Sequence, residues 1–201
     1  VADKEAMEAL AKQQRKVVPM GIKFRVNDKG YVIPNSIRNV ALALEHDPLL
    51  MKVFRYNEFT HEIDVTKGIK ELHIAKGQMV DDYVSLCLSY IEGKYHVLFN
   101  DKVFNAGLVQ VSRDYAYNPL KEYMEDALRH WDGKTRADSF LPVYLGAEMS
   151  PVTTLITKLF FVGAVEKVYK PTMKFDFVLD LVGGQGAGKT TLLKRMGGAY
   201  Y

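Results

Sequence analysis

The most constraining feature of the sequence is a glycine-rich octapeptide, Gly-Gly-Gln-Gly-Ala-Gly-Lys-Thr, at residues 183–190. It fits the pattern G-x-x-x-x-G-K-[S/T], and an apolar segment at residues 175–182 comes directly before it. A buried strand before this pattern and a helix after it are the surroundings that a phosphate-binding loop requires. We therefore predict a strand over 175–182, a phosphate loop, and a helix that begins at Lys189.

The residue types in the loop suit phosphate chemistry. Glycines permit positive φ angles and close approach to phosphate oxygens, and successive N–H groups at a helix start form an anion-binding nest. Lys189 is the predicted catalytic residue because its ammonium group would contact the β and γ phosphates of ATP, and the Thr190 hydroxyl would ligate Mg²⁺. The predicted cofactor-binding residues are Gly183, Gly184, Gln185, Gly186, Ala187, Gly188, Lys189, Thr190 and Thr191.

The pattern alone does not define the reaction, because small-molecule kinases, GTPases, ATPases and helicases share it. Phosphoryl transfer also uses an acidic residue on a second strand and an arginine. The eleven residues after Thr190 contain no such strand. We therefore expect these 201 residues to hold only the first part of the domain, to bind nucleotide weakly and to turn it over negligibly.

Helical periodicity dominates the rest of the sequence, and a Gly/Pro break at residues 146–151 suggests a linker. The predicted fold class is α+β, with a mainly helical front region at 1–150. The first strand-loop-helix of a P-loop α/β NTPase domain follows at 151–201. Predicted helices cover residues 2–16, 36–44, 47–53, 79–95, 103–115, 118–131, 137–145 and 152–169, while a hairpin at 22–34 and a strand at 58–65 supply the predicted β-structure.

Composition narrows the class of protein. Hydrophobic residues make up 48% of the chain and charged residues 25%, as in a globular protein. Cys87 is the single cysteine and lies in an apolar helical stripe. A single cysteine cannot form an internal disulfide, which favours a cytoplasmic location. No apolar run is long enough to span a membrane. Residues 1–30 and 151–201 are basic, which suits DNA contact, although ordinary surface variation explains the charge more simply.

Two further clusters allow more than one interpretation. His61, Glu62 and Asp64 could form a metal site, but alternation along a strand separates His61 from the two carboxylates, so a solvated edge is favoured. Trp131 could stack a nucleic-acid base with Lys134 and Arg136 on phosphates. A buried aromatic anchor at a helix end is favoured, since a sole tryptophan on an apolar stripe usually lies in the core.

Several stretches resemble the virulence-associated protein E family of phages and pathogenicity islands, which is related to primase-associated helicases. The resemblance covers residues 35–201, and the phosphate loop departs from the common pattern only in Thr190, where serine is frequent. A second departure is Thr172, where the family has glycine after the proline. The matching stretches are Asn39-Val40, Leu44, Asp47-Pro48, Tyr56-Asn57-Glu58-Phe59, Asn118-Pro119-Leu120-Lys121-Glu122-Tyr123, Trp131-Asp132-Gly133-Lys134-Thr135-Arg136, Tyr144-Leu145-Gly146-Ala147, and the run from Lys158 through Lys170-Pro171 to the loop.

The resemblance implies an ATP-dependent replication helicase of a mobile element, with ATP and Mg²⁺ as cofactors, DNA as partner and a homo-oligomeric ring. An alternative from another class is a nucleic-acid- or partner-binding adaptor or initiator module in which the phosphate loop is not used. A small-molecule kinase is disfavoured, because long helical material precedes the loop.

Overall fold

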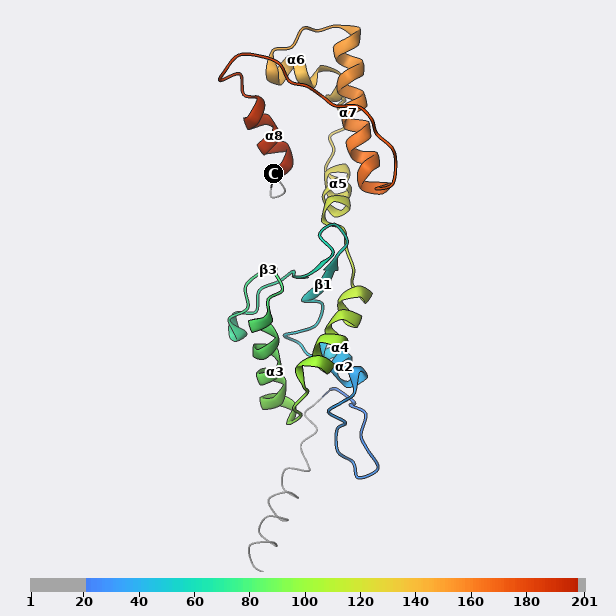
Figure 1. Ribbon diagram of the computed structural model, residues 1–201, viewed down its shortest axis with the longest axis vertical. Coiled ribbons are helices and arrows are strands. Elements are labelled where there is room, and N and C mark those ends of the chain that lie inside the picture. Colours follow the sequence, from blue (N-terminus) through green and yellow to red (C-terminus); the bar gives the residue numbers. More distant parts are fainter. Residues whose placement is uncertain (1–20, 199–201) are drawn as a thin grey trace, which may run out of the picture. The chain divides into compact units, whose positions relative to one another are not determined.

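A computed structural model describes residues 21–198, and the predicted helix at 2–16 lies outside them. The chain divides into two compact units, Val1–Pro119 and Leu120–Tyr201 (Figure 1). The described residues form an α+β, mainly helical structure with one small antiparallel sheet, which confirms the predicted fold class at this level. The predicted linker at 146–151 lies inside the second unit rather than between the units.

The described residues of the first unit form three helices and a three-stranded sheet, and the helix at 101–114 lies against both the helix at 37–46 and the strand at 54–57. Ser36 caps the first helix by accepting a hydrogen bond from Asn39 N–H, and Asn100 caps another through Val103 N–H, as their side chains favour. Strand order is β1-β2-β3, all antiparallel. The elements are α2 (Ile37–His46), β1 (Phe54–Asn57), β2 (Glu62–Val65), the 3₁₀ helix η1 (Lys70–Leu72), β3 (Gly77–Gln78), α3 (Asp81–Tyr95) and α4 (Asp101–Asp114).

The core of this unit is apolar and tightly packed. Phe54, Phe99 and Phe104 are fully buried, and Cys87 is buried on α3 as its stripe predicts. Burial, followed by the nearby charge of Asp47, raises the pKa of the Cys87 thiol to about 12. The thiol therefore stays protonated at neutral pH and packs as a small apolar group.

A buried carboxylate, Asp47, joins α2 to α3. Its oxygens accept hydrogen bonds from Lys94 Nζ at 2.7 Å, Tyr95 Oη at 2.6 Å and Tyr90 Oη at 3.0 Å. They also accept from the backbone N–H of Leu49 at 2.8 Å. Burial alone would raise the pKa of Asp47, but these hydrogen bonds outweigh it and lower the pKa. Asp47 is thus an ionised group with every lone pair engaged.

Two local predictions in this unit are wrong. The segment at 58–65 is not one strand but a turn followed by β2, because the Asn57 side chain accepts hydrogen bonds from the N–H groups of Phe59 and Thr60. His61 then takes a left-handed conformation, which reverses the chain. The helix predicted after Asp47 is only a hydrogen-bonded turn, ended by left-handed Lys52. The hairpin at 22–34 is confirmed in its simplest form by the Val26–Val32 bridge.

The second unit is built around one long helix, α7 (Pro151–Tyr169) (Figure 1). Ser150 caps α7 by accepting from Thr153 N–H, and Pro151 occupies its first turn. Gly146, at φ 67°, ends the preceding helix, so the Gly/Pro break separates two helices of one unit. The other elements are α5 (Pro119–Arg129), the 3₁₀ helix η2 (Ala137–Ser139), α6 (Phe140–Leu145) and α8 (Lys189–Gly197).

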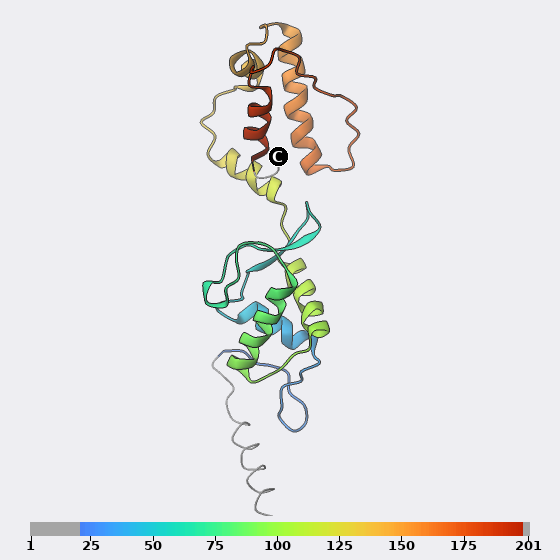
Figure 2. The same ribbon diagram turned by 60° about the vertical axis from the view of Figure 1, so that its left-hand side comes forward.

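The predicted strand at 175–182 is absent. The segment is extended and returns along α7 toward α6, but no strand pairs with it among residues 21–198 (Figure 2). A strand exists only through its ladder of hydrogen bonds to a neighbour. The segment is instead anchored by side chains: a Cβ atom at Gly163 of α7 would lie 2.2 Å from the Phe175 ring. No helix of the described residues is long and apolar enough to cross a membrane.

Candidate functional site

The glycine-rich loop turns directly into α8. Gly186 and Gly188 both have φ of 82°, a left-handed conformation that side chains rarely adopt. Gly188 occupies the N-cap position and accepts a hydrogen bond from Leu192 N–H at 2.9 Å. The two glycines therefore direct the chain so that the loop ends at a helix N-terminus, where backbone N–H groups and the helix dipole favour an anion.

Lys189 is folded back over the loop. Its Nζ donates to the Gly183 carbonyl at 2.6 Å and to the Gly184 carbonyl at 2.9 Å. These bonds hold the ammonium group above the loop rather than in bulk solvent, although the side chain remains only half-buried. The positive charge of Lys189 therefore lies over the loop.

A cavity of about 500 Å³ opens beside the loop. Loop residues Gly183, Gly184, Ala187 and Lys189 form one wall, and the rest comes from α6, α7 and the extended segment. Gln185, Thr190 and Thr191 are exposed and do not line it. The remaining lining residues are Leu141, Leu145, Gly146, Ala147, Thr153, Ile156, Leu179, Asp180, Leu181 and Val182.

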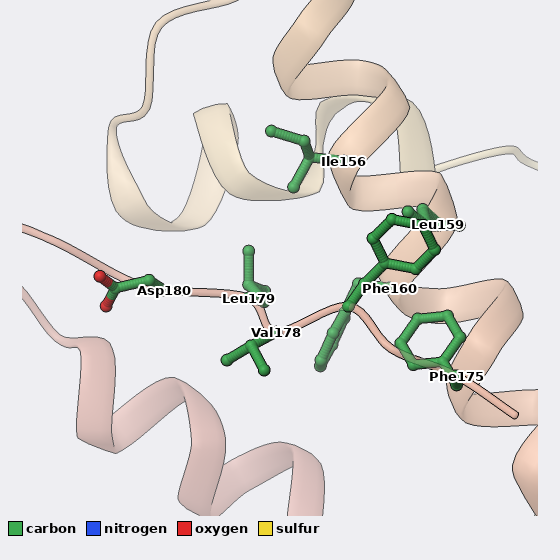
Figure 3. A pocket seen from close by; sticks show the side chains of 8 residues that line it. Ile156, Leu159, Phe160, Phe175, Val178, Leu179 and Asp180 are labelled. Carbon is green, nitrogen blue, oxygen red and sulfur yellow. The ribbon is translucent and has the colours of Figure 1, made fainter.

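A second, smaller cavity of about 180 Å³ lies between α7 and the extended segment. Figure 3 shows Ile156, Leu159 and Phe160 of α7 beside the extended segment, with Leu179 pointing toward the helix and Val178 pointing away from it. The Asp180 carboxylate lies apart from the aromatic rings. Phe177 completes the apolar lining, and Leu179 and Asp180 line both cavities. The extended segment thus forms a shared wall between an apolar space and the space beside the glycine-rich loop.

Sequence reasoning identified the loop but missed the rest of the cavity. For residues 146–151 the sequence predicts only a linker, because glycine and proline signal a chain break and do not reveal what the segment lies against. Gly146 and Ala147 of this segment line the cavity. No sequence motif marks Asp180 as a site residue, because it is a single acidic residue in an apolar segment. Its place in both cavities follows from the path of the segment along α7.

The other candidate residues form no metal centre. Among the described residues, no group of three or more His, Cys, Asp or Glu side chains could hold a metal ion. Asp64 accepts hydrogen bonds from Asn57 Nδ2 at 2.8 Å and Tyr117 Oη at 2.6 Å, so its carboxylate has a structural role. The described geometry does not support the metal site that His61, Glu62 and Asp64 could form.

The buried-anchor interpretation of Trp131 is wrong. The side chain follows the end of α5 and is 56% exposed, because the apolar stripe of α5 has no buried residue. The tight turn after it is confirmed, with Gly133 at φ 77°.

The comparisons with known proteins bear on the second unit. Residues 124–201 match the family model of the virulence-associated protein E-like domain. No curated protein matches the chain. The match includes the Trp131 turn, α6, α7 and the glycine-rich loop, and it agrees with the resemblance seen in the sequence. The similarity to the virulence-associated protein E-like domain covers residues 124–201, the part of the chain that holds the glycine-rich loop.

Proposed function

We propose that this chain binds Mg-ATP through residues 183–191 and serves an ATP-dependent DNA replication helicase of a phage or other mobile element. The observation that carries the proposal is the Lys189 ammonium group, held over the Gly183 and Gly184 carbonyls beside a cavity of about 500 Å³. In this proposal the phosphates displace those carbonyl contacts, and Lys189 then donates to the β and γ phosphates.

The other loop residues have separate roles in the proposal. The N–H groups of residues 185–189 surround the phosphates, as a nest at a helix start does. Thr190 holds Mg²⁺ through its hydroxyl, and it is free to do so because its side chain is exposed on the first turn of α8. The nucleoside lies in the cavity toward the α6–α7 corner. Only the resemblance to the family supports DNA as the partner and a homo-oligomeric ring as the assembly.

The direct test measures equilibrium binding of ATP, with and without Mg²⁺, to the wild-type chain and to Lys189→Ala. A hydrogen bond to a charged group contributes about 1.5–3 kcal/mol, so the variant is expected to bind about 10- to 150-fold more weakly. Lys170→Ala is the matched control, because Lys170 is an exposed lysine of the same unit that lies at the end of α7. Equal affinity of wild type and Lys189→Ala would defeat the proposal.

A second candidate is an adaptor or initiator module in which the loop is not used. It is favoured by the segment 175–182, which has no partner strand among residues 21–198, whereas parallel strands are normally buried on both faces. Two measurements separate the candidates. The adaptor does not bind ATP, and it binds its nucleic-acid or protein partner with the same affinity in Lys189→Ala as in wild type.

A further inference from the structure

The turn that follows α5, residues 131–136, holds an exposed aromatic ring in a braced backbone. The Trp131 indole Nε1 donates to the Lys134 carbonyl at 3.1 Å, and Lys134 N–H donates to Asp132 Oδ1 at 3.1 Å. Arg136 closes the turn by donating to both Asp132 oxygens, at 2.9 Å and 2.6 Å. The polar edge of the indole is thereby used within the turn, while 56% of the side chain remains open to solvent.

The bracing persists over a wide pH range. The bond from Arg136, followed by the bond from Lys134 N–H, lowers the pKa of Asp132 to about 2. Asp132 is therefore ionised at neutral pH and stays paired with Arg136. A ring fixed in this way loses little conformational freedom when a flat ligand stacks on it, which is the condition for efficient recognition.

The charges near the ring favour an anionic partner. Lys134 and Arg136 lie on the turn itself with exposed side chains, and Arg129 and His130 precede it at the end of α5. Arg136 is paired with Asp132, and Arg129 with Asp126 at 3.0 Å. Lys134 lies on the same turn as the indole, and its side chain is exposed. An exposed aromatic ring next to lysine and arginine is the combination that binds single-stranded nucleic acid, where bases stack and cations contact phosphates.

We propose that the 131–136 turn is a contact site for single-stranded DNA, with a base stacked on Trp131 and the adjacent phosphate held by Lys134. The proposal deepens the proposed function by naming where DNA is contacted, and it rests on that function only for the class of the partner. The site uses none of the residues of the phosphate loop, so the two can be tested separately.

Trp131 is the only tryptophan of the chain, so intrinsic fluorescence reports on this site directly. We expect a 20-nucleotide oligothymidylate to quench the emission in proportion to binding, because a stacked base quenches indole. The expected loss of affinity in Trp131→Ala, measured by anisotropy of a labelled oligothymidylate, is about 5- to 150-fold, with most of the affinity recovered in Trp131→Phe. Tyr169→Ala, an exposed aromatic at the end of α7, is the matched control and leaves binding unchanged.

Lys134→Ala tests the phosphate contact. Loss of one phosphate contact on a single strand reduces the slope of log affinity against log salt concentration by about 0.7. The helical circular dichroism of each variant provides the folding check, because it does not depend on any ligand. A Trp131→Ala chain that keeps the wild-type helical signal but binds the oligonucleotide poorly supports the proposal.

Other outcomes overturn it. Oligothymidylate binding without quenching and with unchanged affinity in Trp131→Ala places the DNA elsewhere. Quenching by ATP but not by oligothymidylate assigns the ring to the nucleoside. A blue shift that grows with protein concentration in the absence of DNA means that a second copy covers the ring. Absence of any oligothymidylate binding defeats the proposed contact, while ATP binding would still stand as the test of the phosphate loop.

Discussion

Replacing Asp47 by asparagine tests the physical account of the first unit. The substitution keeps the size of the side chain but removes its charge and exchanges one acceptor oxygen for an amino group. That group would face donors that already point at it, namely Lys94 Nζ, Tyr95 Oη and Tyr90 Oη. At least one buried donor would then lack an acceptor, and the Lys94 ammonium group would lose its counter-ion.

The magnitude follows from the burial of each partner. Removing one partner of a fully buried ion pair costs about 3–5 kcal/mol. The Asp47 side chain is fully buried, but the Lys94 side chain is 35% exposed and keeps part of its hydration. We therefore expect Asp47→Asn to lower the free energy of unfolding by about 2–4 kcal/mol, a large share of the roughly 5–15 kcal/mol of a typical domain.

The pH dependence has a definite sign. The folded-state pKa of Asp47 lies below its ordinary value of 3.8. The stability that its ionised form contributes is thus complete above about pH 5, and it is lost as the pH falls through 3.8 toward the lower folded-state value. The difference in unfolding free energy between wild type and Asp47→Asn should be constant from pH 5 to 7 and should shrink below pH 4.

Hydrogen exchange of the α3 amides, measured by mass spectrometry in increasing urea, reports the unfolding of the first unit. The fluorescence of Trp131 reports the unfolding of the second unit. Asp28→Asn is the control, because Asp28 lies exposed in the turn of the hairpin at 22–34. A change of less than about 0.5 kcal/mol in Asp47→Asn, the range of ordinary surface substitutions, would refute the reasoning.

Three further substitutions give distinct expectations. Gly107→Ala should destabilise the first unit by about 1–3 kcal/mol, because its Cβ atom would lie 2.5 Å from Val40 Cγ1, whereas Gly93→Ala meets no atom within 4 Å and should be neutral or stabilising in urea unfolding. Gly188→Ala strains a backbone at φ 82° and should weaken ATP binding about 5- to 30-fold in calorimetry; unchanged affinity would show that the loop conformation is unimportant. Thr190→Ala should remove the Mg²⁺ dependence of ATP binding, and a retained dependence would place the metal elsewhere.

The sequence predicts the helices well because their signals are local. Ser36, Asn100 and Ser150 cap the starts of their helices, and Gly146 ends α6. Each helix boundary therefore depends on residues within a few positions of it in the sequence. The glycine-rich loop is also a local signal, because its glycines and Lys189 lie within residues 183–189. Its binding of phosphate stays a prediction. What the periodicity does not reveal is burial: α5 has an apolar stripe, yet none of its residues is buried.

Features that depend on distant partners escaped prediction. The segment at 175–182 has the composition of a strand, but a strand needs a neighbour, and none pairs with it among the described residues. Asp47 was interpreted as a helix-starting residue, since its partners Tyr90, Lys94 and Tyr95 lie more than 40 residues away in the sequence. The sequence predicts Trp131 in the core, because it is the sole tryptophan and lies on an apolar helical stripe. Neither of these properties determines how exposed the side chain is.

The central claim, that residues 183–191 bind a nucleoside triphosphate by its phosphates, is tested most directly at the loop amides. Hydrogen exchange of residues 183–191 should be compared in the free chain, with Mg-ATP and with AMP. We expect Mg-ATP to protect the N–H groups of residues 185–189 and AMP to leave them unprotected, because the loop recognises the β and γ phosphates. Loop amides that exchange equally fast in all three samples, at ATP concentrations up to the millimolar range, would contradict the account.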